Sequence, residues 1–172
     1  MQKQLFSVEN KIIIITGGGK GIGGVIAHAM AQRKAVVYCF DIEFEDGIIE
    51  ELAQNLYQVK VDITKKSSIK KTCEEIFSTH NKIDVLINNA GITNPIDYFE
   101  TYPIDNWERT LNVNLTGSFI CSQVVLEYMK KNKGGSIINI TSLNAELAFP
   151  NNPAYVASKG GLKMLGKALA RD

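Results

Sequence analysis

The sequence is short of the residues that build disulfide frameworks and metal sites. Its 172 residues include two histidines and three cysteines, Cys39, Cys73 and Cys121, which lie far apart and form no CxxC pair. An odd number of isolated cysteines argues against a disulfide framework, and no spacing typical of a metal site is present. We therefore expect no metal, and we expect the cysteines to be small buried residues of a protein in the reducing cytoplasm.

Long apolar runs and an excess of charge are also missing. The apolar runs at residues 12–15, 36–40 and 85–87 are short, whereas a membrane-spanning helix needs about 20 residues. Residues 1–10 lack the apolar core of a signal peptide. The 19 Lys and Arg residues nearly balance the 18 Asp and Glu residues, for a formal net charge of +1. We expect neither a membrane nor a nucleic acid as a partner.

What the sequence does contain is a regular alternation of strand-like and helix-like segments. Apolar residues at helical spacing, such as Ile22, Val25 and Ile26, characterise residues 21–34, 68–80, 106–131 and 154–172. Segments rich in Ile and Val, typical of strands buried on both faces, cover residues 11–16, 35–41, 58–62, 84–88 and 136–141. The alternation predicts one α/β domain over residues 1–172, with a doubly wound parallel sheet of strand order 3-2-1-4-5.

A glycine-rich turn joins the first expected strand to the first expected helix. Residues 16–23 read TGGGKGIG. Glycines let the backbone approach a dinucleotide pyrophosphate, and the helix N-terminus offers free N–H groups and the positive end of its dipole. A loop of this kind can also bind nothing. The strand before it and the amphipathic helix after it are the context that a dinucleotide site requires.

An acidic residue in the expected position favours NAD as the cofactor. Asp41 ends the second expected strand, 18 residues after Gly23. Its carboxylate can accept hydrogen bonds from the adenosine ribose hydroxyls. Lys20 in the glycine-rich turn opposes this reading, because its cation could meet the 2′-phosphate of NADP. A carboxylate repels that phosphate whereas Lys20 can point into solvent, so NADP is the less favoured cofactor.

Four further motifs follow in order. They are Asn88-Asn89-Ala90-Gly91 after the fourth expected strand, Asn114 on the long helix, Ser142 after the fifth strand, and Tyr155-x-x-x-Lys159, which begins 13 residues later. Together with the glycine-rich turn, this series resembles the short-chain dehydrogenase/reductase family from about residue 7 to residue 172, in particular its 3-oxoacyl reductase and sugar-alcohol dehydrogenase members. The resemblance implies a Rossmann-type fold and an NAD(P)-dependent oxidoreductase.

The last motif carries the expected chemistry. Tyr155 and Lys159 lie four residues apart and would share one face of a helix. A nearby ammonium and a cationic nicotinamide ring favour the phenolate of a tyrosine, whose ordinary pKa is about 10. Tyr155 would then take a proton from an alcohol while a hydride leaves for NAD⁺, or return one to a carbonyl. Ser142 would bind the same substrate oxygen. By resemblance, Lys159 also reaches the nicotinamide ribose, and Asn114 holds a water that links Lys159 to solvent.

The resemblance assigns the cofactor contacts position by position. Asp62 would lie beside the adenine, and the small residues after the fourth strand would lie against the adenosine and its ribose. Asn88 has two equally weighted readings, one as a cofactor contact and one as a structural residue that ties the fourth strand to its neighbour. The predicted catalytic residues are Asn114, Ser142, Tyr155 and Lys159. The predicted cofactor residues are Gly17, Gly19, Lys20, Gly21, Ile22, Gly23, Asp41, Asp62, Ile63, Asn89, Ala90, Gly91, Tyr155 and Lys159.

The sequence departs from the family at its end. The chain stops at Asp172, in the helix that carries Tyr155 and Lys159, whereas family members continue with two more strands. We expect the C-terminal part of the usual fold, and with it part of the substrate pocket, to be missing. The expected substrate is a secondary alcohol or ketone, and residues such as Asn94 and Asn152 favour a polar ligand such as a sugar. A non-catalytic dinucleotide-binding module is the alternative. For a full-length form the resemblance implies a homo-oligomer, a dimer or a tetramer.

Overall fold

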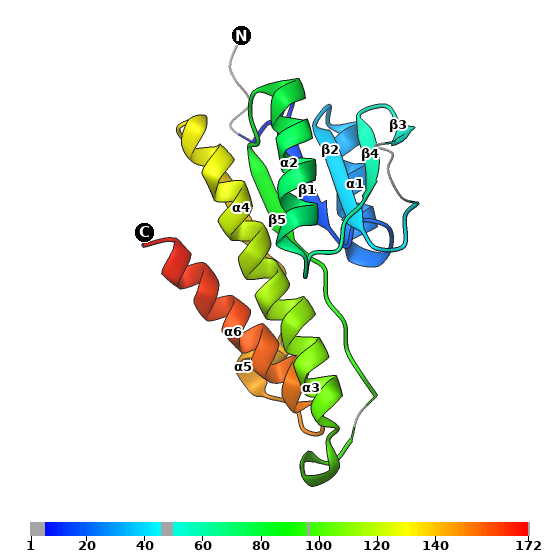
Figure 1. The fold of residues 1–172 in the computed structure, drawn as a ribbon, viewed down its shortest axis with the longest axis vertical. Coiled ribbons are helices and arrows are strands. Elements are labelled where there is room, and N and C mark those ends of the chain that lie inside the picture. Colours follow the sequence, from blue (N-terminus) through cyan, green and yellow to red (C-terminus); the bar gives the residue numbers. More distant parts are fainter. Residues whose placement is uncertain (1–5, 46–49, 96, 172) are drawn as a thin grey trace.

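The computed structural model describes residues 6–45, 50–95 and 97–171. Figure 1 shows a twisted sheet with helices on both faces. Two long helical stretches extend beyond the end of the sheet. The strands are β1 (Ile12–Thr16), β2 (Val36–Asp41), β3 (Glu50–Ala53), β4 (Leu56–Lys60), β5 (Val85–Asn88) and β6 (Ser136–Asn139). The α-helices are α1 (Gly21–Gln32), α2 (Lys66–His80), α3 (Ile104–Leu111), α4 (Ser118–Lys131), α5 (Asn144–Leu147) and α6 (Pro153–Leu169), with a short 3₁₀ turn at Phe99–Thr101.

The strand order is β3-β4-β2-β1-β5-β6. All pairs are parallel except β3 with β4. The five parallel strands confirm the predicted doubly wound sheet and its order. The chain moves from β1 to β2 and β4 on one side, then crosses to β5 and β6 on the other. The carboxyl ends of β1 and β5 therefore meet where the winding reverses, which is where such sheets bind ligands.

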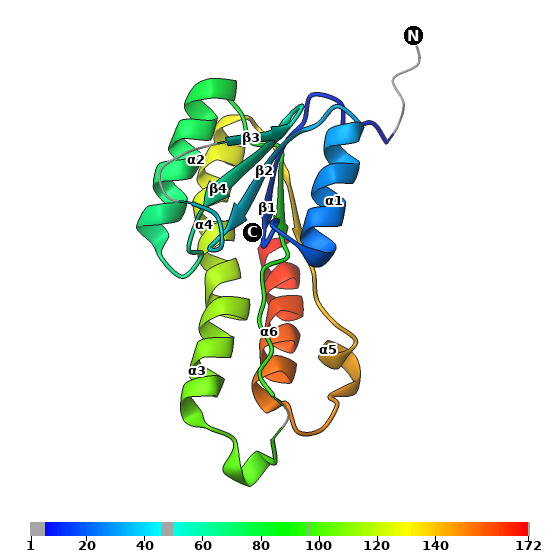
Figure 2. The same cartoon turned by 90° about the vertical axis from the view of Figure 1, so that its right-hand side faces the viewer.

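Side chains of β1 alternate between two separate hydrophobic cores. Ile12 and Ile14 pack with α2 and α4, whereas Ile13 and Ile15 pack on the face covered by α1. Figure 2 shows α1 on one side of the sheet and α2 with α4 on the other. Because both faces of the strand are covered, every position from Ile12 to Thr16 is buried. The β-branched run that predicted this strand is thus the centre of the molecule.

Several expected element boundaries were wrong. The third expected strand begins and ends two residues earlier, at Leu56 and Lys60, so Asp62 lies beyond the strand. The strand β3 was missed because Glu50–Ala53 has few residues that favour strands, and it pairs with β4 across an irregular register. The predicted helix over residues 106–131 is interrupted by a π-helical segment, η2 (Asn112–Gly117), between α3 and α4.

The prediction that the apolar residues of the first helix form one buried face was also partly wrong. Ile22 and Val25 are 65% and 71% exposed. Because α1 lies against the sheet through Gly23 and Ala27, these two side chains face away from it. Ile22 instead lines a cleft at the end of the sheet.

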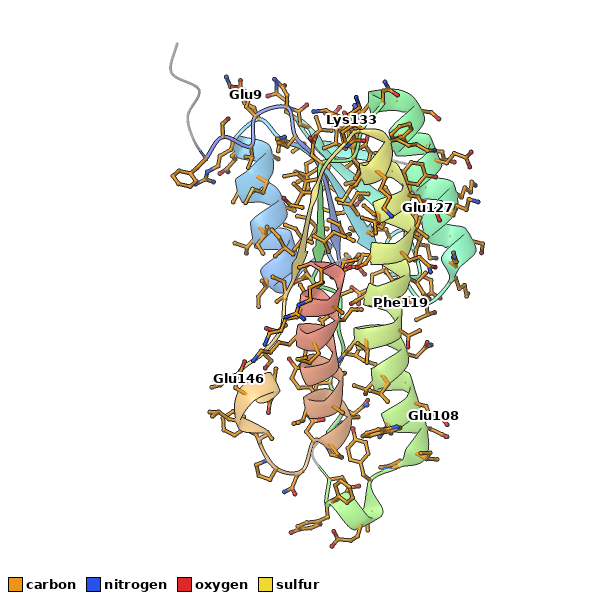
Figure 3. The ribbon with its side chains drawn as sticks, turned by 90° about the vertical axis from the view of Figure 1, so that its left-hand side faces the viewer. Glu9, Glu108, Phe119, Glu127, Lys133 and Glu146 are labelled. Atoms are coloured by element: carbon orange, nitrogen blue, oxygen red, sulfur yellow. The ribbon has the colours of Figure 1, made fainter. Side chains whose placement is uncertain are left out.

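The long helices extend beyond the sheet (Figure 1). Figure 3 shows α3 and α4 as nearly one rod, with Glu108 near one end and Lys133 just beyond the other, and α6 lying alongside it. On its other side α6 packs against α5, where Lys163 forms an ion pair with Glu146. This arrangement brings α6, and therefore Tyr155 and Lys159, to the carboxyl ends of the central strands.

Candidate active site

The glycine-rich turn is held tightly against the end of β2. The N–H of Gly17 donates to the carbonyl oxygen of Phe40 at 2.7 Å, and Gly17 has a φ of +64°. At Gly23, a Cβ atom would lie 2.3 Å from the carbonyl oxygen of Gly17. Only glycine fits here, because the first turn of α1 approaches the backbone of the loop so closely.

The N-terminus of α1 points into this turn without a side-chain cap. Lys20 occupies the N-cap position and makes no capping hydrogen bond, and the first turn contains no acidic residue. Gly21 begins the helix with a φ of +56° and open space around it. The uncapped N–H groups and the positive end of the helix dipole are therefore left for an anion.

The end of β2 presents the predicted ribose-binding carboxylate. Asp41 accepts the N–H of Gly19 at 3.1 Å through Oδ2, and the N–H of Glu43 at 3.2 Å through Oδ1. A side chain at Gly19 would collide with Asp41 Oδ2, since its Cβ would lie at 2.9 Å. The glycine and the aspartate are thus fitted to each other. The side chain of Lys20 is 73% exposed, as the sequence allowed, and its ammonium pairs with Glu43.

Asp62 is fixed one strand further along. Its Oδ1 accepts the N–H of Thr64 at 3.0 Å and the hydroxyl of Thr64 at 2.6 Å. Burial alone would raise the pKa of Asp62, but the hydrogen bonds from Thr64 and the ion pair with Lys65 outweigh burial and lower it. Asp62 is therefore ionised at neutral pH and held in place beside Ile63.

These groups surround one cleft of about 530 Å³ at the carboxyl ends of the strands. The predicted residues that line it are Gly17, Lys20, Ile22, Asp41, Asp62, Ile63, Asn89, Ala90 and Gly91. Residues that the sequence reasoning missed are Phe40, Ile42, Glu43, Val61, Thr64, Ile92, Thr93, Arg109 and Val113. Most of the missed residues are immediate neighbours of predicted residues in the sequence. Their position next to a motif is therefore the feature that could have predicted them. Arg109 and Val113 come from α3 and η2, and only the fold brings them here.

Asn89 joins β5 to the glycine-rich turn. Its Nδ2 donates to the carbonyl oxygens of Thr16 and Gly17, both at 3.0 Å. The hydroxyl of Thr16 in turn accepts the backbone N–H groups of Asn89 and Ala90. Asn89 therefore lines the cleft and also fixes the position of the glycine-rich turn, part of which lines the cleft.

Asn114 lies in the π-helical segment and is completely buried. Its Oδ1 accepts the N–H of Ile92 at 2.8 Å, and its Nδ2 donates to the carbonyl of Ile92 at 2.9 Å and to Ser158 Oγ at 3.1 Å. Both amide protons are therefore used, whereas Oδ1 keeps one free lone pair. Short π segments inside helices are often found at functional sites. Here the segment holds the amide against the strand end next to Gly91.

Lys159 connects the cleft with the predicted catalytic tyrosine. Its side chain is only 4% exposed, and Nζ donates to the carbonyl of Ile140 at 2.8 Å. A Cβ added to Gly91 would lie 3.5 Å from Nζ and 3.3 Å from Asn114 Oδ1. On the other side, Nζ lies 5.7 Å from the centre of the Tyr155 ring. Burial lowers the pKa of Lys159 below its ordinary value of 10.5.

The remaining catalytic candidates are Tyr155, on the same helix as Lys159, and Ser142, two residues after the Ile140 that Lys159 contacts. Tyr155 is half-buried in the first turns of α6, four residues before Lys159. Ser142 follows Ile140 by two residues, and its Oγ accepts the N–H of Asn144 at 3.2 Å. In this part of the chain Ser142 is thus bonded to the turn that starts α5, and the structure does not join it directly to Tyr155.

The asparagines expected to face a polar substrate have other partners. Asn94 Nδ2 donates to Thr110 Oγ1 at 2.7 Å, and Asn152 Nδ2 donates to Thr93 Oγ1 at 2.9 Å. The Oδ1 atom of Asn144 accepts the N–H of Phe149. These side chains order the loops around the site, so they do not by themselves indicate a sugar.

The structure gives Asn88 a structural role, and the cysteines are buried as expected. Asn88 Nδ2 donates to Asn139 Oδ1 at 2.9 Å and to Ser122 Oγ at 3.0 Å, which ties β5 to β6 and α4. The three cysteines are free and buried.

In residues 6–45, 50–95 and 97–171 no cluster of three His, Cys, Asp or Glu side chains could hold a metal ion. Over the same ranges, none of the helices has the length and apolar character needed to cross a membrane.

The structure shows a doubly wound α/β domain with a cleft at the carboxyl ends of its strands, and sequence comparison gives the family. The family described as "short chain dehydrogenase" matches residues 11–172, and the chain belongs to it. An uncharacterized oxidoreductase of Thermotoga maritima is 38% identical over 168 residues, which cover 95% of this chain and 65% of that protein.

Two further relatives have described activities. The NAD-dependent glycerol dehydrogenase of Listeria innocua is 32% identical over 169 residues, which cover 97% of this chain and 66% of that protein. The crystal structure of an NAD⁺-bound xylitol dehydrogenase matches with a TM-score of 0.86 and 27% identity, covering 96% of this chain and 65% of that chain. The chain thus spans about 65% of the length of these relatives.

Proposed function

We propose that this chain forms the cofactor-binding and catalytic part of an NAD(H)-dependent oxidoreductase that interconverts a secondary alcohol and a ketone. One observation carries the proposal. The ammonium of the buried Lys159 lies near Gly91, at the wall of the cleft, and 5.7 Å from the centre of the Tyr155 ring. The predicted acid–base residue Tyr155 and the wall of the cleft at Gly91 are thus close to the same cation.

The residues of the cleft fit a nicotinamide dinucleotide. The pyrophosphate would lie at the N-terminus of α1, because the helix has no side-chain cap there and the space beside Gly21 is open. Asp41 would receive the adenosine ribose hydroxyls and Asp62 would lie beside the adenine. Small residues at Ala90 and Gly91 leave space for the rest of the molecule. When bound, the nicotinamide ring supplies the hydride acceptor or donor.

The protein's own part of the chemistry is the movement of a proton. In the proposed reaction the Tyr155 hydroxyl group carries the proton, and the ammonium of Lys159 lies 5.7 Å from the centre of its ring. The phenolate oxygen takes the proton of the substrate alcohol as the carbonyl forms, and in the reverse direction the hydroxyl returns it. Nζ of Lys159 has one donor committed to Ile140, which leaves two for a ribose hydroxyl or a water near Asn114 Oδ1. Ser142 would fix the substrate oxygen.

The substrate class is supported by the relatives. One is named a glycerol dehydrogenase and another a xylitol dehydrogenase. We infer that a small polyol or sugar is the substrate, in preference to a 3-oxoacyl thioester. The cofactor choice, NAD over NADP, rests on the fixed carboxylate of Asp41. As part of the same proposal, the whole enzyme is a cytoplasmic homo-oligomer.

Tyr155→Phe tests the acid–base role, in a polypeptide that also contains the segment equivalent to the last third of the relatives. Loss of the hydroxyl should lower kcat for polyol oxidation by about 10²-fold or more, with cofactor affinity changed little because the ring remains. Lys159→Ala should reduce both turnover and cofactor affinity. Tyr98→Phe is the matched control, since Tyr98 is 67% exposed on a loop away from the cleft.

Two outcomes would contradict the proposal. A Tyr155→Phe enzyme that keeps most of its kcat would remove the general acid–base assignment. A parent protein that binds NADH but oxidises no alcohol, and reduces no ketone, would instead favour the non-catalytic dinucleotide-binding module.

A further inference from the structure

An ion pair lies beside Asp41 in the lining of the cleft, where the adenosine ribose would lie. Lys20 Nζ and Glu43 Oε1 are 2.5 Å apart. Both side chains line the cleft together with Asp41. Lys20 comes from the glycine-rich turn and Glu43 from the loop after β2, so the pair bridges the two segments that would hold the ribose. The hydrogen bond and the negative charge of Glu43 raise the pKa of Lys20.

The charges in this part of the cleft sum to a net negative value. Asp41 and Glu43 each contribute one negative charge, and Lys20 contributes one positive charge. Asp41 cannot easily turn away, because both of its oxygens accept backbone N–H groups. The 2′-phosphate that distinguishes NADP carries a further charge of about −1.5 to −2. Without Glu43, Lys20 would balance Asp41 and would be free to meet that phosphate.

We propose that Glu43 is a determinant of cofactor specificity, which excludes the 2′-phosphate of NADP by engaging the ammonium of Lys20. The inference rests on the proposed function, in that it requires a nicotinamide dinucleotide in this cleft. It goes beyond the role of Asp41, because it makes rejection of NADP depend on a second carboxylate, Glu43, and on whether the ammonium of Lys20 is paired with it. The two side chains are 73% and 59% exposed, so the ion pair itself stabilises the fold little. The ion pair matters because it determines whether the ammonium of Lys20 is available to contact the cofactor.

The test measures the dissociation constants of NADH and NADPH, from nicotinamide fluorescence, for the 172-residue chain and for Glu43→Gln. We expect Glu43→Gln to shift the affinity ratio toward NADPH by about tenfold, the effect of one charge-assisted contact at a partly exposed site. The shift should shrink at high ionic strength, because exposed charges are screened.

Two further variants separate the mechanism from a general loss of negative charge. Glu45→Gln removes the same charge from an exposed position on the same loop, and it should leave the ratio near that of the parent. The double variant Lys20→Met with Glu43→Gln should lose the gain, because the gain requires the freed ammonium.

Each result decides between distinct conclusions. An equal shift in Glu43→Gln and Glu45→Gln, or a gain that survives removal of Lys20, would overturn the role assigned to Glu43. A Glu43→Gln chain that keeps the parental ratio would overturn it too. A parent chain that binds neither NADH nor NADPH would overturn the proposed function, and the inference with it.

Discussion

At the scale of single residues, two neighbouring glycines of α1 serve different ends. A Cβ at Gly23 would lie 2.3 Å from the Gly17 carbonyl oxygen and 2.4 Å from Asn89 Nδ2. At Gly24 the nearest atom would be the Gly18 carbonyl oxygen at 3.5 Å, an ordinary contact. Gly23 is therefore required by close packing. Gly24 is not required by packing, and its only effect is to lower the stability of the helix.

We expect Gly24→Ala to raise the free energy of unfolding by about 0.5–1 kcal/mol, because alanine loses less backbone entropy in a helix. Gly23→Ala should lower it by about 2 kcal/mol or more, since the loop or Asn89 has to move. Urea unfolding of the two variants beside the parent measures both. A Gly23→Ala chain as stable as Gly24→Ala would show that the helix and the loop are not packed as described.

Motifs were predictable at this scale, but side-chain partners were not. Asp41 and Asn88 could be placed from the sequence because the ends of parallel strands fix where they lie. The pairing of Lys20 with Glu43 could not, because both side chains are long and exposed and their contact depends on how two loops approach. The use of both amide protons of Asn114 depends likewise on the π segment, for which its sequence, NVNLTG, gives no recognised signal.

At the scale of elements, strands buried on both faces gave the strongest signal. Continuous Ile and Val runs predicted β1, β2 and β5 within a residue or two. The antiparallel β3 was missed because an edge strand needs little apolar character when it is held by backbone hydrogen bonds. Periodicity could not separate α3 from α4, since a π segment inserts one residue per turn without a proline or glycine break at its start.

One carboxylate joins the beginnings of two central strands. Asp84 accepts the N–H of Ile12 at 2.9 Å and pairs with Lys11 at 3.1 Å and Lys82 at 3.0 Å. Burial would raise the pKa of Asp84, but the bonds from Ile12 and both lysines outweigh burial and lower it below the ordinary 3.8. The stabilisation is therefore complete above pH 3.8 and is lost as the pH falls through the lower, folded-state pKa.

Asp84→Asn should lower the free energy of unfolding by about 2 kcal/mol at neutral pH, because charge-assisted bonds are weakened. The difference from the parent should diminish as the pH falls below 3.8, where the parent carboxylate also becomes protonated. Urea unfolding across this range checks the prediction. Glu108→Gln, at an exposed position on α3 (Figure 3), is the control. A deficit that is the same at acid and neutral pH would contradict the electrostatic account.

At the scale of the whole molecule, one edge of the sheet is open. In the described part of the chain β6 pairs only with β5, and Ile138 is 46% exposed. A groove of about 520 Å³ lies beside it between α4 and α6, lined by Met129, Ile137, Leu169 and neighbouring residues. No proline or charge lies within β6 to protect its unpaired backbone groups.

We expect the 172-residue polypeptide to associate with itself as its concentration rises. Sedimentation velocity over a range of concentrations measures this association. Ile138→Lys, which places a charge on the exposed edge strand, should reduce it. If the polypeptide stays monomeric at all concentrations, with or without the substitution, the open edge of β6 does not cause association.

The central claim is that the cleft between the glycine-rich turn and Gly91 holds a nicotinamide dinucleotide. A titration of NADH into the parent chain, Gly24→Ala and Gly23→Ala, followed by nicotinamide fluorescence on folded protein, tests it most directly. We predict saturable binding by the parent and by Gly24→Ala, and affinity at least about tenfold lower for Gly23→Ala, because a methyl group there displaces the loop that receives the pyrophosphate. A parent chain that binds no NADH, or a folded Gly23→Ala chain that binds it equally well, would contradict the account.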